Sequence, residues 1–330
     1  MFTINIDKFS ELDCINIENK AQGIELQIIH GFGAIINKFI VNNSPFSFIQ
    51  GYQSGQELKD TNPFFSRSAK LFPFVNRLNN GCYHYQNSEY QLPANFPWSD
   101  QHAVHGLLYD QAFKIVEQQA NADFAQVRVC FESKHLHEGF PFSIKLEIDY
   151  KIEADGQLTC HTDIVNTGLK TFPFADGFHP YFNLGQPLQN CLIQIPSCQH
   201  LETTDDLPNG QVQQFTQFVN ATSLADITLN DCYQFSDNTN RAEAVKIELS
   251  CQNKKSSISY WQNDAINDGY RFIQLYTPSD EDSIAIEPMT SPADAFNNKI
   301  SLQELNPRES ISLVWGCQAS YLAELSPAKY

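Results

Sequence analysis

The stretch FSIKLEIDYKI, residues 142–152, decides the class of fold. Every even position in it is apolar and every odd position between them is polar. This period of two is typical of a long strand with one buried face. Residues 154–157 (ADGQ) then predict a turn, and the alternation resumes at Leu158, Cys160 and Ile164. The segment therefore predicts a β-hairpin.

The same pattern recurs along the chain. Apolar and polar residues alternate at 127–131, 245–251, 258–260 and 311–317, whereas helical periodicity is limited to a turn or two at 56–60 and 223–229. No linker, charge block or fixed-period repeat divides the sequence. We therefore expect one all-β, mostly antiparallel domain spanning residues 1–330, built as two packed sheets or as a barrel.

Composition limits the classes of function. The 330 residues include 42% hydrophobic side chains, enough for a sizeable core, and carry a formal net charge of −17. A field of that sign repels phosphate backbones and anionic lipids, so we expect neither nucleic-acid nor membrane partners. The N-terminal residues lack the pattern of a signal peptide, and no stretch approaches the roughly 18 apolar residues of a membrane helix. Nine scattered cysteines without CxxC pairs favour reduced thiols and a cytoplasmic location.

Two of the segments that interrupt the alternation carry basic residues. In PFVNRLNNG (73–81), Arg77 is flanked by apolar positions, so its charge either reaches solvent or pairs with a specific partner. His102 and His105 are three residues apart, but no third ligand follows at a fitting spacing, so we expect no metal. His105 then has either a structural role or a role in a site. A second pair, His135 and His137, is expected on a solvated loop.

Two further segments suit acid and base chemistry. In DGFHPYFNLG (176–185), His179 is held between aromatic residues and fixed by the proline that follows it. Apolar surroundings keep such a histidine neutral or poised near physiological pH, which suits a general acid. In IAIEPM (284–289), Glu287 lies on the strand phase opposite Ile284 and Ile286, and burial there raises the pKa of a carboxyl toward the range of a base.

Taken in order, these segments resemble the aldose 1-epimerases. The resemblance rests on Asn76-Arg77-Leu78 with Gly81, His105-Gly106, His179-Pro180-Tyr181-Phe182, and Glu287-Pro288 followed by Asp294-Ala295-Phe296-Asn297. It also includes Gly51-Tyr52 and Tyr90-Gln91-Leu92, and it covers roughly residues 25 to 320. Each motif alone is weak, but five in the right order and spacing are specific.

The resemblance implies a single-domain β-supersandwich of the galactose mutarotase type with a sugar-binding cleft on one sheet. It implies that His179 protonates the ring oxygen of a pyranose and that Glu287 takes the proton from the C1 hydroxyl. It further implies that Asn76, Arg77 and His105 bind the sugar, and that neither metal nor cofactor takes part. We expect both reacting side chains to face one cleft, a sugar ring's width apart, in a monomer or homodimer.

One position departs from the family pattern. Members commonly carry an aspartate in a D-x-x-F stretch that binds sugar hydroxyls, and spacing from Tyr233 puts Asn230 at that position with Asp231 beside it. An asparagine side chain still offers one donor group and one acceptor group to hydroxyls. The sequence leaves open which of the two residues serves.

Three alternative functions follow from the same residues. A hexose-6-phosphate 1-epimerase shares the acid and base, but Tyr109 stands where that group often has an arginine, which leaves Arg67 and Lys70 as phosphate partners. A non-catalytic carbohydrate-binding protein needs neither His179 nor Glu287. A glycoside hydrolase or lyase could pair Asp176 with Glu287, although the sequence fixes no distance between them.

Overall fold

The computed structural model describes residues 1–330 apart from 100, 236–243, 264–268, 281 and 324–330. The hairpin predicted from residues 142–164 is present as β12 (Ile144–Glu153) and β13 (Gln157–Asn166). The two strands pair antiparallel with Tyr150 opposite Cys160. On both strands the even-numbered residues are buried, as the alternation predicts.

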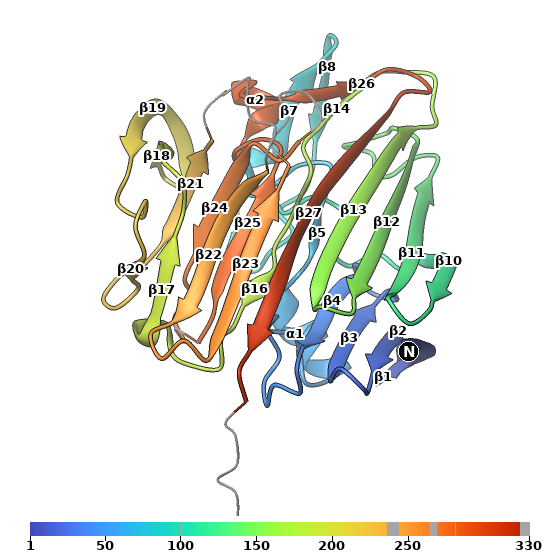
Figure 1. Cartoon of the computed structure of the whole chain (residues 1–330). Helices are drawn as coiled ribbons and strands as arrows, with labels where there is room; N and C mark the ends of the chain where they lie inside the picture. The colour runs from blue at the N-terminus through green and yellow to red at the C-terminus, as the bar shows by residue number, and fades with distance from the viewer. Residues whose placement is uncertain (100, 236–243, 264–268, 281, 324–330) are drawn as a thin grey trace, which may run out of the picture.

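This hairpin lies within a nine-stranded antiparallel sheet whose long strands run side by side in Figure 1. Its order is β10 (Lys114–Ala120), β11 (Phe124–Ser133), β12, β13, β27 (Ser310–Tyr321), β23 (Ser256–Gln262), β22 (Val245–Cys251), β17 (Cys191–Gln194) and β20 (Thr222–Ser223). The strands predicted at 127–131, 245–251, 258–260 and 311–317 all belong to this sheet.

An eight-stranded sheet forms the second large layer. Its order is β19 (Leu207–Phe215), β18 (Cys198–Thr204), β21 (Asn230–Gln234), β24 (Phe272–Tyr276), β25 (Ile284–Met289), β15 (Gly177–Phe178) and β5 (Lys70–Leu71), and β16 (Tyr181–Phe182) pairs with β25 off this path. All of these pairs are antiparallel. The expectation of two packed sheets is confirmed, and the barrel is not formed.

The main core fills the space between the two large sheets. Trp315 of β27 packs against Phe178 of β15, with ring centroids 5.5 Å apart, and both side chains are buried. Ile284 and Ile286 of β25 join the same core. Because side chains alternate along a strand, Glu287 points to the other face of the eight-stranded sheet, away from the core.

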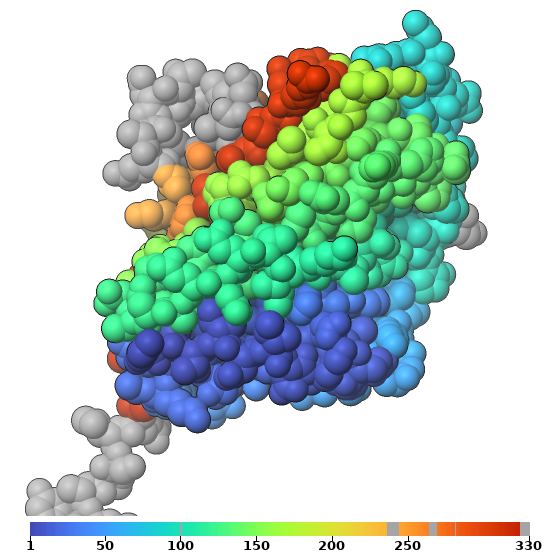
Figure 2. Space-filling view, turned by 90° about the vertical axis from the view of Figure 1, so that its right-hand side faces the viewer, coloured from blue at the N-terminus to red at the C-terminus, as the bar shows by residue number. Residues whose placement is uncertain are grey.

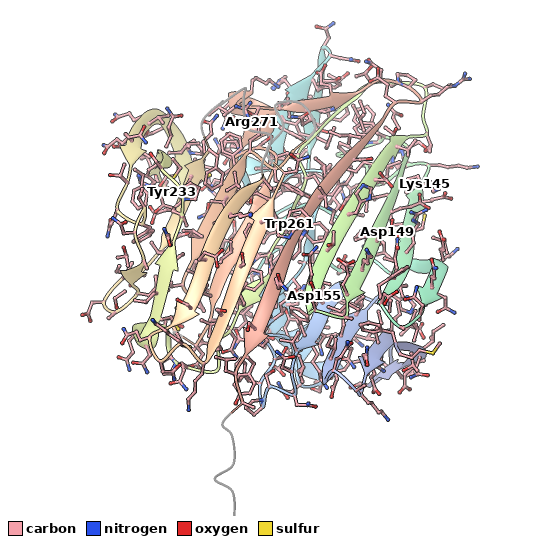
Figure 3. The ribbon with its side chains drawn as sticks, in the orientation of Figure 1. Lys145, Asp149, Asp155, Tyr233, Trp261 and Arg271 are labelled. Atoms are coloured by element: carbon pink, nitrogen blue, oxygen red, sulfur yellow. The ribbon has the colours of Figure 1, made fainter. Side chains whose placement is uncertain are left out.

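The outer face of the nine-stranded sheet is polar, and Lys145 and Asp149 lie there in Figure 3. Trp261 covers Gly316 on this face, because a Cβ at Gly316 would lie 2.6 Å from the indole ring. The sheet is thus apolar toward the core and mostly polar outward, the arrangement expected of antiparallel layers.

Four N-terminal strands make a separate sheet in sequence order, with β1 (Thr3–Phe9), β2 (Leu12–Asn19), β3 (Ile24–Ile29) and β4 (Ile35–Ile40). Figure 2 shows its dark blue surface directly below the green strands β10 to β12. The backbone N–H of Phe2 donates to the carbonyl of Asn121 at 2.9 Å and joins the two regions. Three short pairs complete the strands: β6 (Arg77–Leu78) with β9 (Ala103–Val104), β7 (Cys82–Tyr85) with β8 (Ser88–Gln91), and β14 (Phe172–Phe174) with β26 (Gln303–Leu305).

The predicted helical turn at 56–60 is part of α1 (Gly55–Phe65), whose N-terminus is capped by the Ser54 hydroxyl accepting from the N–H of Glu57. The helical turn predicted at 223–229 is wrong. Ser223 pairs with β17, and Asp226 adopts a left-handed backbone that ends any helix. The sequence also missed the short α2 (Ala295–Asn298), while two 3-10 turns cover Asn79–Gly81 and Leu188–Asn190.

Within the described residues, no helix is long and apolar enough to cross a membrane.

Candidate active site

Side chains from three neighbouring strands of the eight-stranded sheet project to one side. Glu287 of β25 lies directly opposite Gln274 of β24, and Gln274 lies opposite Cys232 of β21. Two residues along β21, on the same face, Asn230 lies opposite Tyr276 of β24. The Gln274 amide donates to Asn230 Oδ1 at 3.0 Å. Cross-strand register therefore brings residues far apart in sequence into one row.

His179 sits in the connection between β15 and β16, where its backbone is fixed on both sides. Its N–H donates to the carbonyl of Ala69, and its carbonyl accepts from the N–H of Ser68. The imidazole stacks on Tyr181 at 4.9 Å and meets the His105 ring edge-on at 5.2 Å. The histidine is therefore held in one orientation by aromatic contacts, as its sequence setting indicates.

Arg77 begins β6, and His105 directly follows β9, the strand that pairs with β6. The N–H of His105 donates to the carbonyl of Asn76 at 2.8 Å, and both residues adopt left-handed backbone conformations, with φ of 58° and 50°. Such conformations are uncommon outside glycine and gather at functional sites. Gly106 follows with φ of +76°, and a Cβ there would lie 2.2 Å from the Phe72 carbonyl oxygen.

The segment Asp294 to Asn297 supports this loop and does not line the cleft. The N–H of Asp294 donates to the carbonyl of Arg77 at 2.7 Å, and its carboxylate accepts from the N–H of Asn79 at 2.9 Å. The Asn297 amide donates both to Asp294 and to the carbonyl of Cys82. This motif of the sequence therefore positions the arginine segment.

These side chains surround a cleft with a volume of about 360 Å³. It is lined by Phe64, Phe65, Asn76, Arg77, Trp98, His105, His179, Tyr181, Asn230, Gln274, Tyr276 and Glu287. Phe64 and Trp98 are 56% and 41% exposed, and the Trp98 indole N–H donates to the carbonyl of Pro63. Aromatic walls with convergent polar groups are typical of a small-molecule site.

His179 and Glu287 are in direct contact in this cleft. The Nε2 of His179 lies 3.4 Å from Glu287 Oε1, and both side chains are almost fully buried. Burial lowers the pKa of His179 to about 3. Burial also raises the pKa of Glu287 well above its ordinary value, although the Arg77 guanidinium opposes this shift. Both shifts favour the uncharged forms, a neutral imidazole beside a protonated carboxyl.

The other polar groups of the cleft are also desolvated. Burial, and then the charges of His179 and Arg77, lower the pKa of His105 well below its ordinary value. The Nδ1 atoms of His105 and His179 and Oε2 of Glu287 are buried and have no hydrogen-bond partner within the described part of the chain. Unpaired buried polar atoms are costly, and a cluster of them in one cleft is suited to a ligand rich in hydroxyls.

The structure brings together Asn76, Arg77, His105, His179, Asn230 and Glu287 and separates Asp231 from them. Asp231 points to the opposite face of β21, where its carboxylate lies 2.8 Å from His200 Nε2. Period-two alternation makes this outcome unavoidable once Asn230 faces the cleft. Sequence reasoning missed Gln274, whose polar side chain within the apolar strand 272–276 was the available signal, and the aromatic residues Phe64, Phe65, Trp98, Tyr181 and Tyr276.

The expected separation of a sugar ring's width between acid and base is wrong, because the two groups touch. The chemistry explains the correction. In a pyranose the C1 hydroxyl oxygen and the ring oxygen are bonded to the same carbon, so two groups in contact with each other can reach both oxygens.

Three other residues weighed from the sequence lie outside the cleft. Lys70 is fully buried and donates to Asp176 at 2.5 Å, and Tyr270 donates to the same carboxylate oxygen at 2.9 Å. Arg67 is 7% exposed and contacts Glu57 and the carbonyl of Gly51. Neither cation lines the cleft, and Asp176 is engaged elsewhere.

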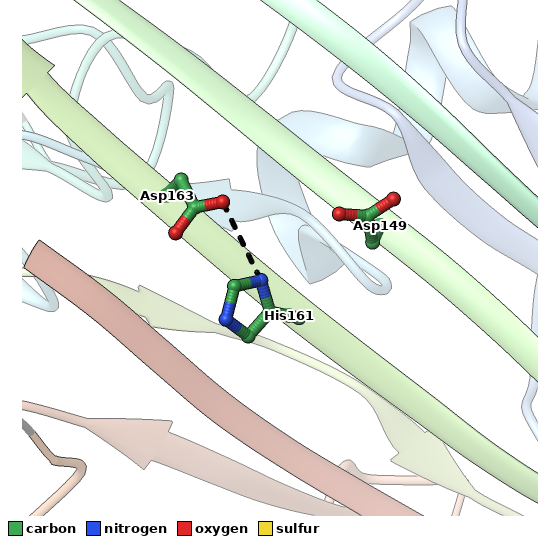
Figure 4. A group of neighbouring side chains, drawn as sticks. All are labelled: Asp149, His161 and Asp163. Atoms are coloured by element: carbon green, nitrogen blue, oxygen red, sulfur yellow. Dashed lines mark ion pairs between the residues drawn. The ribbon is translucent and has the colours of Figure 1, made fainter. Parts of the chain in front are cut away.

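His102 and His105 have different surroundings, since His102 Nδ1 accepts from the N–H of Asn80 while His105 faces the cleft. Among the residues that the structure describes, the group with ligand-like spacing is Asp149, His161 and Asp163 on the outer face of β12 and β13 (Figure 4). Arg128 donates to Asp149 at 2.9 Å and 2.8 Å through Nε and Nη2. Because the positive Arg128 guanidinium already pairs with the Asp149 carboxylate, it disfavours binding of a metal cation by this group.

The sequence and fold place the chain in a known family. The model of the aldose 1-epimerase family matches residues 13–316, so the chain belongs to that family. A curated relative, the uncharacterised protein YihR of Escherichia coli K12, is 26% identical over 244 residues, which cover 70% of this chain and 72% of YihR.

Solved structures share the whole architecture. A galactose mutarotase-like protein from Clostridium acetobutylicum superposes with a TM-score of 0.84 at 20% identity, covering 98% of this chain and 99% of that one. Galactose 1-epimerase from Lactobacillus acidophilus gives a TM-score of 0.78 at 18% identity, with 98% and 99% covered. The fold is therefore the β-supersandwich of the galactose mutarotase type.

Proposed function

We propose that the protein is an aldose 1-epimerase that interconverts the α and β anomers of a free hexose such as galactose or glucose. The observation that carries the proposal is the buried contact between His179 and Glu287 at 3.4 Å in a polar cleft. The reaction needs one proton to leave O1 while another arrives at the ring oxygen, and this pair offers one site for each.

The proton carried by His179 and Glu287 changes its position at each step of the reaction. In this mechanism the proton first moves from the Glu287 carboxyl to His179 across their 3.4 Å contact. Ionised Glu287 then takes the proton from O1 while protonated His179 gives one to the ring oxygen, and the C1–O5 bond breaks as C1=O1 forms. The open-chain aldehyde rotates about C1–C2. The reverse transfers then close the ring as the other anomer and restore both groups. The pair carries one proton throughout, so the cycle requires no exchange with solvent.

The remaining cleft residues bind and orient the sugar in this proposal. Arg77, His105, Asn76 and Asn230 supply donors and acceptors to the ring and its hydroxyls, and Gln274 holds the Asn230 amide in place. The positive charge of Arg77 in the cleft wall also stabilises the negative charge that shifts between O1 and the ring oxygen as the ring opens.

A phosphorylated hexose is disfavoured by the surroundings of the cleft. Lys70 is paired with buried Asp176, and Arg67 is covered by Tyr52 and Phe65, whose rings lie 5.3 Å and 4.6 Å from its guanidinium carbon. The Tyr109 side chain carries no positive charge and cannot bind a phosphate in the bidentate way that an arginine does. A cytoplasmic location is part of the proposal, and the nine cysteines, eight of them buried, are free thiols, as suits that compartment.

Polarimetry of freshly dissolved α-D-galactose and α-D-glucose tests the proposal. Wild type should accelerate mutarotation of one or both sugars, and Glu287→Gln and His179→Gln should each reduce the rate by about 10²–10⁴-fold. His200→Gln, on the opposite face of the sheet, is the matched control and should keep the wild-type rate. Unchanged rates in Glu287→Gln would overturn the proposed base, and sugar binding without any mutarotation would favour the non-catalytic alternative. Glucose 6-phosphate as the preferred substrate would favour the phosphate-specific alternative.

A further inference from the structure

A second hairpin brings a carboxylate to the edge of the cleft. The turn between β18 and β19 carries Asp206, whose Oδ2 lies 2.9 Å from Nη2 of Arg77. Asp206 Oδ1 accepts from the Asn230 amide at 3.5 Å. Both partners line the cleft, and they also line a small adjoining pocket together with Asp206 and Thr203. A side chain far from Arg77 in the sequence thus completes the polar wall.

The ion pair spans the boundary between cleft and solvent. The Arg77 side chain is 17% exposed, whereas that of Asp206 is 49% exposed. Asp206 is therefore reachable by a ligand, while Arg77 remains largely desolvated. Its guanidinium has five donors, so it can keep the carboxylate and still bind another oxygen.

The charges of the cleft are balanced by this contact. Arg77 is the permanent cation among the described lining residues, and burial favours the uncharged form of the Glu287 carboxyl. Asp206 then supplies the negative charge that offsets Arg77. Without it, the guanidinium fork would face the cleft alone, which is the arrangement that binds phosphates and carboxylates bidentately.

We propose that Asp206 is a specificity-determining residue that restricts the cleft to uncharged pyranoses. The carboxylate accepts from one sugar hydroxyl while Arg77 donates to a neighbouring oxygen, so the pair matches a vicinal diol. The same carboxylate repels phosphate, carboxylate or sulfonate groups on a sugar and occupies the fork that would hold them. This inference rests on the proposed function and deepens it by naming the substrate class.

The test compares Asp206→Asn with Asp205→Asn in the full chain. Asp205 is the adjacent residue of the same turn, both adopt left-handed backbone conformations that asparagine tolerates, and both changes remove one negative charge. Mutarotation of galactose, galacturonate and galactose 6-phosphate is measured for each protein, and binding of the same three sugars is measured by calorimetry. Thermal unfolding confirms that each variant is folded.

Asp206→Asn should lower kcat/KM for galactose by about tenfold and raise it for the two anionic sugars by about tenfold, and affinities should change in parallel. Asp205→Asn should leave the preference for neutral over anionic sugars unchanged. An equal preference in both variants, with wild type active on galactose, overturns the role of Asp206 and leaves the proposed function standing. If wild type turns over no sugar, the proposed function fails, and the calorimetric preference still decides whether Asp206 selects against charge.

Discussion

The Nε2 of His179 lies 3.4 Å from Oε1 of Glu287, and their side chains are 7% and 3% exposed. Burial moves the two pKa values in opposite directions, toward neutral imidazole and neutral carboxyl. In the proposed mechanism the pair carries one proton that resides on either residue, and ring opening and ring closure use these two arrangements. The contact gives that proton a direct path between the two residues.

The first prediction concerns the pH dependence of kcat/KM for galactose. In the proposed mechanism the singly protonated pair is the active form, so activity should fall on the acid side as the pair gains a second proton and on the alkaline side as it loses its only one. Because Arg77 lowers the pKa of Glu287, Arg77→Gln should move the alkaline limb to higher pH as well as reduce the rate. Arg128→Gln, on the outer face of the nine-stranded sheet, should leave the profile unchanged. An alkaline limb that moves to lower pH in Arg77→Gln would contradict the assignment of that limb to Glu287.

The second prediction concerns stability. The folded-state pKa of Glu287 is raised, so its contribution to folding is fully present below the unfolded pKa and is lost as the pH rises through the folded pKa. Glu287→Gln removes this loss and should stabilise the fold by about 1–3 kcal/mol at neutral and alkaline pH, with less effect near pH 4. Urea unfolding at several pH values measures the difference. Glu138→Gln, an exposed control, should show no such dependence on pH, and a Glu287→Gln protein that is less stable than wild type at pH 8 would refute the argument.

The third prediction concerns the loop that presents His105. At Gly106 a Cβ would meet the Phe72 carbonyl, and the backbone φ of +76° adds strain, so Gly106→Ala should displace His105 and reduce kcat/KM by about tenfold or more. Gly210→Ala is the matched control, because Gly210 has φ of +87° but a Cβ added there would meet no atom within 4 Å. Polarimetry measures the loss of activity, and thermal unfolding measures the loss of stability. Equal losses in both variants would mean that backbone strain alone, and not the close approach to Phe72, accounts for the change.

The sequence predicts six strands of the nine-stranded sheet because burial of one face imposes a period of two, as in β12 and β13. It also singles out His179 from its immediate neighbours, and this residue lines the cleft. It fails at 223–229, where the local pattern resembles a helix but Ser223 pairs with the sheet edge at β17. Pairing partners of this kind are set by the fold and leave no local mark.

The site is less predictable for the same reason. The contact between His179 and Glu287, and the choice of Asn230 over Asp231, depend on cross-strand register in the eight-stranded sheet. Gln274 stands opposite Glu287 across that register, and only its polarity within an apolar strand hints at a role. Asp206 has no local signal at all, since an acidic residue at a hairpin turn is ordinary and only the folded chain brings it to Arg77.

The fourth prediction concerns the buried ion pair of Lys70 and Asp176, which lies outside the cleft. Burial lowers the pKa of Lys70 to about 8, and Asp176 opposes that shift. Lys70→Met leaves a buried carboxylate without its partner, so the variant should lose about 3–5 kcal/mol of stability, measured by urea unfolding. Adding Asp176→Asn removes the unpaired charge and should restore part of the loss.

The double variant Lys70→Met/Asp176→Asn also tests the role of Asp176 in chemistry. If the only role of Asp176 is its buried ion pair with Lys70, the folded double variant should mutarotate galactose within a few-fold of the wild-type rate. No group of the cleft has changed in this variant. If Asp176 acted with Glu287 as a catalytic carboxylate pair, the rate would fall by about 10²-fold or more even in the folded protein. Measuring the rate per folded molecule, with the folded fraction taken from circular dichroism, separates loss of structure from loss of chemistry. Since Lys70 and Tyr270 both donate to the same oxygen of Asp176, the carboxylate is committed to the interior, and retention of activity is the expected result.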